Sequence, residues 1–327
     1  MYIKRKYSLW MTFNWSKRPF ILGFIYSLAI SVISYFTNLY IAIPWQPISI
    51  IGISVAFYLG FKNNSSYDRT WEARKIWGSI VNNSRAFGAA VTTFVQGEDA
   101  EKIHKELIYR HIAWFNSLRH QLRLSRPWEH DTRLNEKYAP NVCEDYMVQL
   151  EDDLIPFLST IEMKYIEQKS NGAAQILQIQ SKRLQELKDQ GYFEDFRHME
   201  LNSLIINLYA DQGKTERIKN FPFPRQYAST AIWLTFVFCA FVPFGLLAVF
   251  KDLNSWMYWL GPFISALIIW IFFLMEKIGD YSENPFEGTY NDVPITSIAK
   301  AIEIDLREML NDDNIPSPTP SENGFLM

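Results

Sequence analysis

Charged residues are absent from long stretches of the chain, and these stretches predict its membrane part. No Asp, Glu, Lys or Arg occurs between Arg18 and Lys62. A helix needs about 20 apolar residues to cross the roughly 30 Å hydrocarbon core of a bilayer, so this run is long enough for two crossings. The sequence Pro44–Pro47 interrupts it, and proline is disfavoured inside a helix. We therefore expect two membrane helices joined by a tight turn, at Pro19–Ile43 and Ile48–Lys62, the second continuing as a helix into water.

Two further uncharged runs follow late in the chain. They cover Gln226–Phe250 and Leu253–Met275 and are separated by Lys251 and Asp252. Each is long enough for one crossing. The pattern predicts four transmembrane helices in all.

The part of the chain between these two pairs is polar and has helical periodicity. Apolar residues recur at helical spacing in Glu101–Leu124 and in Ala173–Lys188, which is typical of amphipathic helices. We find no sustained alternation of the kind that strands show. The predicted organisation is a cytosolic N-terminal segment at 1–18, membrane helices one and two within 19–62, a cytosolic helical region at 63–225, membrane helices three and four within 226–275, a cytosolic C-terminal helical segment at 276–311, and a flexible tail at 312–327.

Basic residues at the ends of the predicted crossings indicate an orientation. The first 18 residues contain no acidic residue and carry the basic residues Lys4, Arg5, Lys6, Lys17 and Arg18. Short cytoplasmic segments next to membrane helices are enriched in Lys and Arg. The N-terminus is therefore expected in the cytoplasm, and four crossings return the C-terminus to the same side.

Composition removes several classes of function. The chain of 327 residues is 48% hydrophobic and 16% aromatic, with a net charge of -3. A chain with this net charge has no overall positive electrostatic field, so its composition does not favour nucleic acid as a partner. Its cysteines, Cys143 and Cys239, lack the spacing of a disulfide framework or metal site, and no enzyme motif is present. His104 and His111 could share a helix face, but no carboxylate or cysteine completes a metal site; we interpret them as surface or interface histidines.

The second predicted crossing carries the most informative pattern. Ile53, Phe57 and Phe61 recur every four residues, so they lie along one stripe of a helix. Gly52 and Gly60 flank the stripe and would allow neighbouring helices to approach closely. Periodicity alone favours a stripe that faces lipid or the helix bundle. The alternative is a hydrophobic constriction, in which several copies of this helix surround a pore that closes by dewetting.

Several motifs make the chain resemble the bestrophin family, in particular its bacterial branch. They are Arg18–Phe20, Gly52–Phe61, Tyr67–Gly78, Glu216–Pro224, Glu283–Phe286, Asn291–Pro294 and Ile302–Leu306. The resemblance implies an all-α membrane protein that assembles as a homopentamer around one axial pore. In that family three apolar rings form a narrow neck, and the matching positions are Ile53, Phe57 and Phe61. A second, cytosolic aperture corresponds to Phe196, counting back from Pro224.

The resemblance also implies a function and a location. It implies a passive channel for small monovalent ions in the bacterial inner membrane, not an enzyme. Animal members conduct anions such as chloride, whereas some bacterial members resemble cation channels, and an apolar neck does not fix the sign of the ion. A non-conducting membrane scaffold and a secondary transporter remain alternatives.

A calcium cofactor is not expected. Animal bestrophins carry an acidic clasp directly after their Asn-Pro-Phe motif. Here the six residues that follow Asn284–Phe286 contain only two acidic residues, Glu287 and Asp292. Calcium takes 6–8 oxygen ligands, several of them charged, so the sequence predicts no calcium clasp and no other cofactor.

Overall fold

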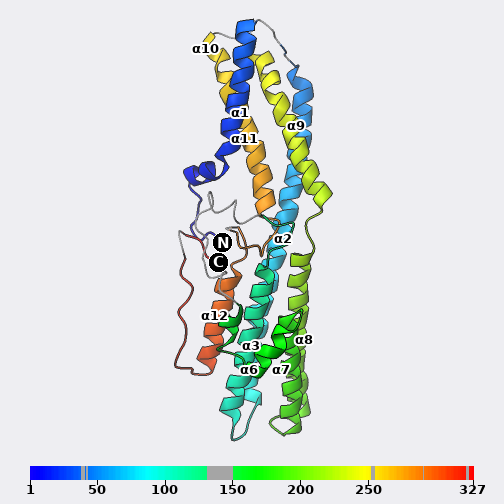
Figure 1. The fold of residues 1–327 in the computed structure, drawn as a ribbon, viewed down its shortest axis with the longest axis vertical. Helices are drawn as coiled ribbons and strands as arrows, with labels where there is room; N and C mark the ends of the chain where they lie inside the picture. Colours follow the sequence, from blue (N-terminus) through cyan, green and yellow to red (C-terminus); the bar gives the residue numbers. More distant parts are fainter. Residues whose placement is uncertain (38–40, 42, 131–149, 252–254, 290, 322–323) are drawn as a thin grey trace.

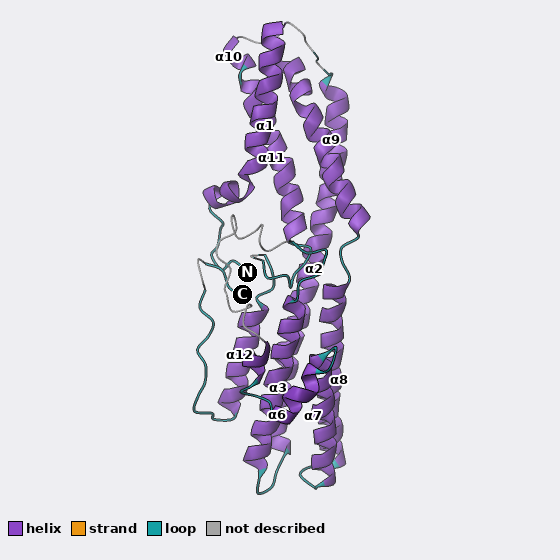
Figure 2. Ribbon diagram, viewed as in Figure 1, coloured by secondary structure: helices purple, strands orange, loops and turns teal. Residues whose placement is uncertain are grey.

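The protein is an elongated, all-helical molecule, described by a computed structural model for residues 1–37, 41, 43–130, 150–251, 255–289, 291–321 and 324–327. Every regular element in these residues is a helix (Figure 2). A single isolated β-bridge joins Tyr2 and Phe325. Figure 1 shows two helical bundles arranged end to end along the long axis. The predicted all-α class is confirmed.

Apolar helices form one end of the molecule. They are α1 (Leu9–Thr37), α9 (Arg225–Phe250), the short α10 (Ser255–Tyr258) and α11 (Leu260–Tyr281). Among the described residues, three stretches are long and apolar enough to cross a membrane: Leu9–Thr37, Arg225–Phe250 and Trp256–Tyr281. α11 packs against both α1 and α9. The remaining predicted crossing lies at the start of α2, where the apolar part is shorter than in the other three.

Helix α2 (Trp45–Phe94) connects the two ends of the molecule. Its 50 residues run from the apolar bundle into the polar one without a break (Figure 1). It packs against α9 and α11 first and then against α8 and α12. Pro47 lies in the first turn of α2, where the missing N–H removes no helical hydrogen bond. The prolines that separate the two crossings in the sequence therefore initiate α2.

The polar end is a second helical bundle, built around the second half of α2. Its helices are α3 (Ala100–Arg123), α5 (Leu150–Leu154), α6 (Thr160–Glu167), α7 (Gly172–Asp189), α8 (Asp195–Asn220) and α12 (Ile295–Met309). Five large aromatic side chains are fully buried in its core: Trp77, Phe87, Trp114, Phe115 and Phe286. The observed α3 and α7 agree with the predicted helices to within one residue at each end, because both have strong apolar periodicity.

The two ends of the chain meet beside α12. The N–H of Ile3 donates to the carbonyl of Gly324 at 2.9 Å, and the N–H of Leu326 donates to the carbonyl of Met1 at 2.8 Å. Phe325 and Met327 are buried. The end of the segment that the sequence predicts to be a flexible tail is thus packed against the start of the chain.

Candidate functional site

The predicted stripe lies on the outer face of α2. Ile53, Phe57 and Phe61 are 59%, 67% and 64% exposed, respectively. Val55 and Leu59, on the opposite face of the same turns, are buried. The helix therefore uses one face to hold its own bundle together and presents a row of bulky apolar side chains outward. An outward apolar row of this kind is buried by lipid or by other copies of the chain.

Close packing fixes the inner face of α2 against α9. A Cβ atom on Gly52 would lie 2.6 Å from the ring of Phe238, so any larger residue at this position would force the ring to move. Further along, the ring of Tyr58 stacks on that of Tyr227 at 4.4 Å. The predicted role of Gly52 in close helix approach is confirmed. Gly60 differs, because no atom of the described residues lies within 4 Å of the point where its Cβ would stand, and it faces open space.

A buried ion pair lies directly behind the inner end of the stripe. Lys62, the residue after Phe61, is fully buried. Its Nζ lies 2.9 Å from Oε1 of Glu276 on α11 and 3.7 Å from Oδ1 of Asp280. Buried charges are retained only where they are paired, because removing a charge from water costs several kcal/mol. This pair therefore fixes α2 and α11 relative to one another where the stripe ends.

His130 extends this cluster toward the loop that follows α11. Its Nε2 lies 2.8 Å from Oδ2 of Asp280, and its Nδ1 lies 3.1 Å from Oε1 of Glu287. The imidazole also stacks on Tyr281 at 4.1 Å. Burial by itself lowers the pKa of His130, but hydrogen bonding to the two carboxylates outweighs it and raises the pKa to about 10. The imidazolium is therefore charged at neutral pH and bridges two acidic groups.

The raised pKa of His130 predicts a loss of stability in alkaline solution. An imidazole whose pKa is higher in the folded than in the unfolded state stabilises the fold fully below its unfolded pKa of about 6.5. That contribution is lost as the pH rises toward 10, at about 1.4 kcal/mol per unit of pKa difference. We expect the melting temperature of the wild type to fall between pH 7 and pH 10 more steeply than that of His130→Gln. His198→Gln, which alters a histidine stacked on Phe193, is the control; parallel profiles for wild type and His130→Gln would contradict the assignment.

The acidic residues after the Asn-Pro-Phe motif form hydrogen bonds and ion pairs with other side chains and backbone groups of the protein. Oδ2 of Asp292 accepts from Nη1 of Arg123 at 3.3 Å and from the N–H of Thr289 at 3.1 Å, and Oδ1 accepts from the Thr289 hydroxyl at 2.7 Å. Burial raises the pKa of Asp292 to about 6. Glu287 is held by His130. Within the described residues, no cluster of three or more His, Cys, Asp or Glu side chains is placed to hold a metal ion.

Phe196 is the most exposed of the predicted site residues. It is the second residue of α8 and is 85% exposed. α8 starts at the end of the polar bundle that is farthest from α1 and α9 (Figure 1). One subunit therefore does not bring Phe196 close to the stripe on α2, and the two features lie toward opposite ends of the molecule.

His111 contradicts the interpretation of His104 and His111 as surface or interface residues. Its side chain is only 1% exposed and lies against the rings of Phe87, Trp114 and Phe115. Burial lowers its pKa to about 3, so it is neutral. The sequence interpretation was wrong because the central turns of α3 are buried on all sides, so no polar face remains for a histidine. His104 is partly buried and its Nε2 bonds to the carbonyl of Val95 at 2.9 Å.

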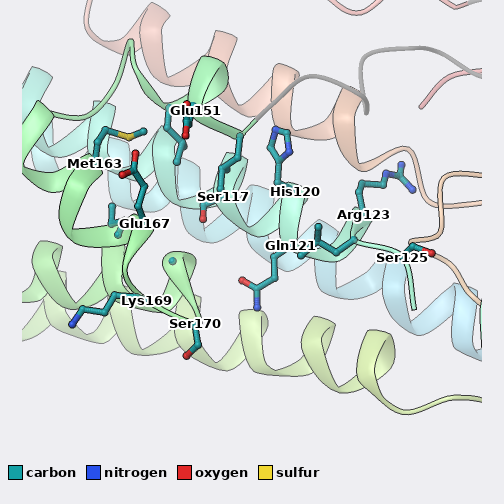
Figure 3. Close-up of a pocket in the computed structure, with 15 residues that line it drawn as sticks. Ser117, His120, Gln121, Arg123, Ser125, Glu151, Met163, Glu167, Lys169 and Ser170 are labelled. Atoms are coloured by element: carbon teal, nitrogen blue, oxygen red, sulfur yellow. The ribbon is translucent and has the colours of Figure 1, made fainter. Parts of the chain in front are cut away.

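A pocket of about 550 Å³ opens on the side of the polar bundle, between α3, α5 and α6 (Figure 3). Leu154, Met163 and Ile166 form apolar parts of its wall. His120 also lines it, but its Nε2 is bound to Oδ2 of Asp153 at 2.7 Å. The pocket contains no residue of the α2 stripe and is separate from the predicted site.

Comparison with known proteins places these features in one family. The sequence profile of the bacterial and fungal bestrophin proteins matches residues 17–308. A voltage-dependent anion channel-forming protein, YneE of Escherichia coli strain K12, is 29% identical over 298 residues, which are 91% of this chain and 87% of the relative. A protein with the same descriptive name from Ralstonia nicotianae is 25% identical, over 91% of this chain and 88% of the relative.

A solved structure has the same fold. The crystal structure of a bacterial bestrophin homologue from Klebsiella pneumoniae superposes with a TM-score of 0.76 at 25% sequence identity. The superposition covers 90% of this chain and 98% of that one. The match therefore includes both the apolar and the polar bundle.

Proposed function

The chain belongs to the bacterial and fungal bestrophin family, and from this premise we propose that it is a passive channel for small monovalent ions whose pathway runs along the outer stripe of α2. The observation that carries the proposal is the exposure of Ile53, Phe57 and Phe61 on a helix whose opposite face is buried. One subunit has no enclosed path along this row. Copies arranged around an axis would turn the row into rings, and a homopentamer is the arrangement that the family resemblance implies.

The neck in this proposal acts as a hydrophobic gate. Three rings of bulky apolar side chains would surround a narrow path that excludes water when dry and conducts ions when wet. Phe196 would form a second constriction at the far end of the polar bundle. Its exposure on α8 supports this role. The start of α2 would cross the membrane beside α1, α9 and α11, which gives four crossings per subunit.

Membership of the family supports a location, and the charge pattern supports an orientation. We place the protein in the bacterial inner membrane, with the polar bundle and both ends of the chain in the cytoplasm. The basic residues of segment 1–18 favour this orientation by the positive-inside rule. The ends of the chain lie together beside α12, so they share one side of the membrane.

We favour anions as the permeant ions. Relatives that match over nine-tenths of the chain are named as anion channel-forming proteins. The ring edges of Phe57 and Phe61 carry partial positive charge and can face an anion. Gating by calcium is not part of the proposal, because Asp292 and Glu287 are already satisfied by Arg123, Thr289 and His130.

The reversal potential of the purified protein in a planar bilayer tests the function. Under a KCl gradient we expect reversal at the chloride equilibrium potential, with no change when calcium is removed by a chelator. Reversal at the potassium potential would make the protein a cation channel. Absence of current from correctly assembled protein would favour a membrane scaffold, and a flux that saturates with substrate would favour a transporter.

A further inference from the structure

Pro19 removes a hydrogen bond near the start of the first apolar helix. It lies inside α1, and its nitrogen carries no hydrogen. In a regular helix that hydrogen would be donated to the carbonyl of Trp15, four residues earlier. A missing bond of this kind, together with the clash of the proline ring, kinks a helix. The first turns of α1 (dark blue) leave the direction of the rest of the helix in Figure 1.

A lysine from α11 takes the place of the missing donor. Nζ of Lys277 donates to the carbonyl of Trp15 at 2.8 Å, and the same ammonium lies 4.2 Å from the centre of the Trp15 ring. Next to it, Nε1 of Trp270 donates to Oγ of Ser16 at 2.8 Å. Two residues of α11 therefore hold α1 at the kink, so the direction of the segment before the kink is fixed by tertiary contacts.

The segment before the kink combines exposed apolar and cationic side chains. Leu9 and Trp10 are 82% and 73% exposed. Lys4, Arg5 and Lys6 are also exposed, and no carboxylate in the described residues forms an ion pair with any of them. No acidic residue occurs before Asp68 in the sequence. Lys4, Arg5 and Lys6 thus carry positive charge that no carboxylate of the described residues neutralises by an ion pair, in the segment that precedes the kink.

We propose that residues 4–18 lie on the membrane surface and bind the headgroups of anionic phospholipids. Trp is enriched at the membrane interface, and amphipathic segments with Lys and Arg bind it through buried apolar area and attraction to anionic lipid. The kink at Pro19 turns the segment away from the direction in which α1 crosses. Leu9 and Trp10 enter the interface, while Lys4, Arg5 and Lys6 reach the phosphates. This binding does not depend on which ion the channel conducts.

Native mass spectrometry of the full chain in detergent, titrated with phosphatidylglycerol or phosphatidylcholine, tests the proposal. Each cation near an anionic surface contributes about 1 kcal/mol, so replacing Lys4, Arg5 and Lys6 together with glutamine should weaken phosphatidylglycerol binding about a hundredfold. Phosphatidylcholine binding should not change. The matched control replaces three exposed lysines of the polar bundle with glutamine: Lys102, Lys164 and Lys182. It removes the same charge and should leave both affinities unaltered.

A second variant tests the geometry while retaining every cation. Pro19→Ala restores the N–H donor for the Trp15 carbonyl, so the first turns of α1 can continue in line with the helix. Phosphatidylglycerol binding should fall about fivefold or more, equivalent to at least one cation leaving the surface. Unchanged binding in Pro19→Ala would overturn the role of the kink. Equal phosphatidylglycerol affinity in the wild type and in the triple variant would overturn the lipid site. If the triple variant then also had a changed oligomeric state, the segment would instead form contacts between copies of the chain.

Discussion

Replacing Ile53, Phe57 and Phe61 together with alanine should increase the single-channel conductance several-fold and raise the current at all voltages. The three side chains are the bulky apolar groups on the outer face of α2, and truncating them widens the proposed neck and lowers the barrier to wetting it. Because these side chains contribute little to packing within the subunit, the fold should tolerate their loss. The measurement is single-channel recording of the reconstituted variant after its assembly has been verified.

A matched control separates the neck from general effects of surface truncation. Ile25, Phe36 and Phe263 are also at least half exposed, on α1 and α11, and their replacement by alanine removes the same side-chain types. This control should conduct like the wild type. An unchanged conductance in the Ile53, Phe57 and Phe61 variant, or an equal increase in the control, would falsify the assignment of the neck.

Replacing Lys62 alone with methionine should lower the free energy of unfolding by about 3–5 kcal/mol, because it leaves Glu276 buried without its cation. Glu276→Gln should destabilise in the same direction by leaving the Lys62 ammonium unpaired. The double variant Lys62→Met/Glu276→Met should recover most of the loss, since apolar residues of similar volume can replace a buried ion pair at little cost. The melting temperature of the purified protein reports all three effects.

An exposed ion pair provides the control for this series. Nη2 of Arg85 lies 2.7 Å from Oδ2 of Asp305, but the Arg85 side chain is 52% exposed. Exposed pairs contribute about 0–1 kcal/mol, so Arg85→Met should change the melting temperature little. If Lys62→Met were tolerated as well as Arg85→Met, the pair between α2 and α11 would not hold these helices together.

Lys62 follows Phe61 directly, so we also expect altered gating in any single variant that assembles.

Local periodicity accounts for most of the fold that could be predicted. Helices α3 and α7 were predicted to within one residue because their apolar residues recur at the helical period. The uncharged run Gln226–Phe250 predicted α9 to within one residue, because the composition of a run is also a local property of the sequence. The predicted bounds of the fourth crossing, Leu253–Met275, differ more from the structure. α11 begins at Leu260 and continues to Tyr281, past the predicted end. Its extension carries Glu276, which is buried and pairs with Lys62, and the partly exposed Asp280, which pairs with His130.

The candidate site was partly visible in the sequence. The spacing of Ile53, Phe57 and Phe61 places them on one stripe whatever surrounds the helix. The cluster behind the stripe was missed because Lys62, His130 and Glu276 come from distant parts of the chain. One signal was available: Lys62 is the first charge after one uncharged run, and Glu276 is the first charge after another. Where two predicted membrane helices end in opposite charges, the sequence alone allows an ion pair between these charges to be proposed.

The sequence by itself determined which parts of this protein are helical, which of them are apolar enough for a membrane, and which side chains share the outer stripe of α2. These properties depend on residues within a few turns of one another. Only the tertiary structure decided that His111 lies in the core, that Lys62 pairs with Glu276, and that Lys277 supports the kink at Pro19. Such contacts depend on how separate helices approach in space, and the free energy of burying a charge or an imidazole is set by the partners found there.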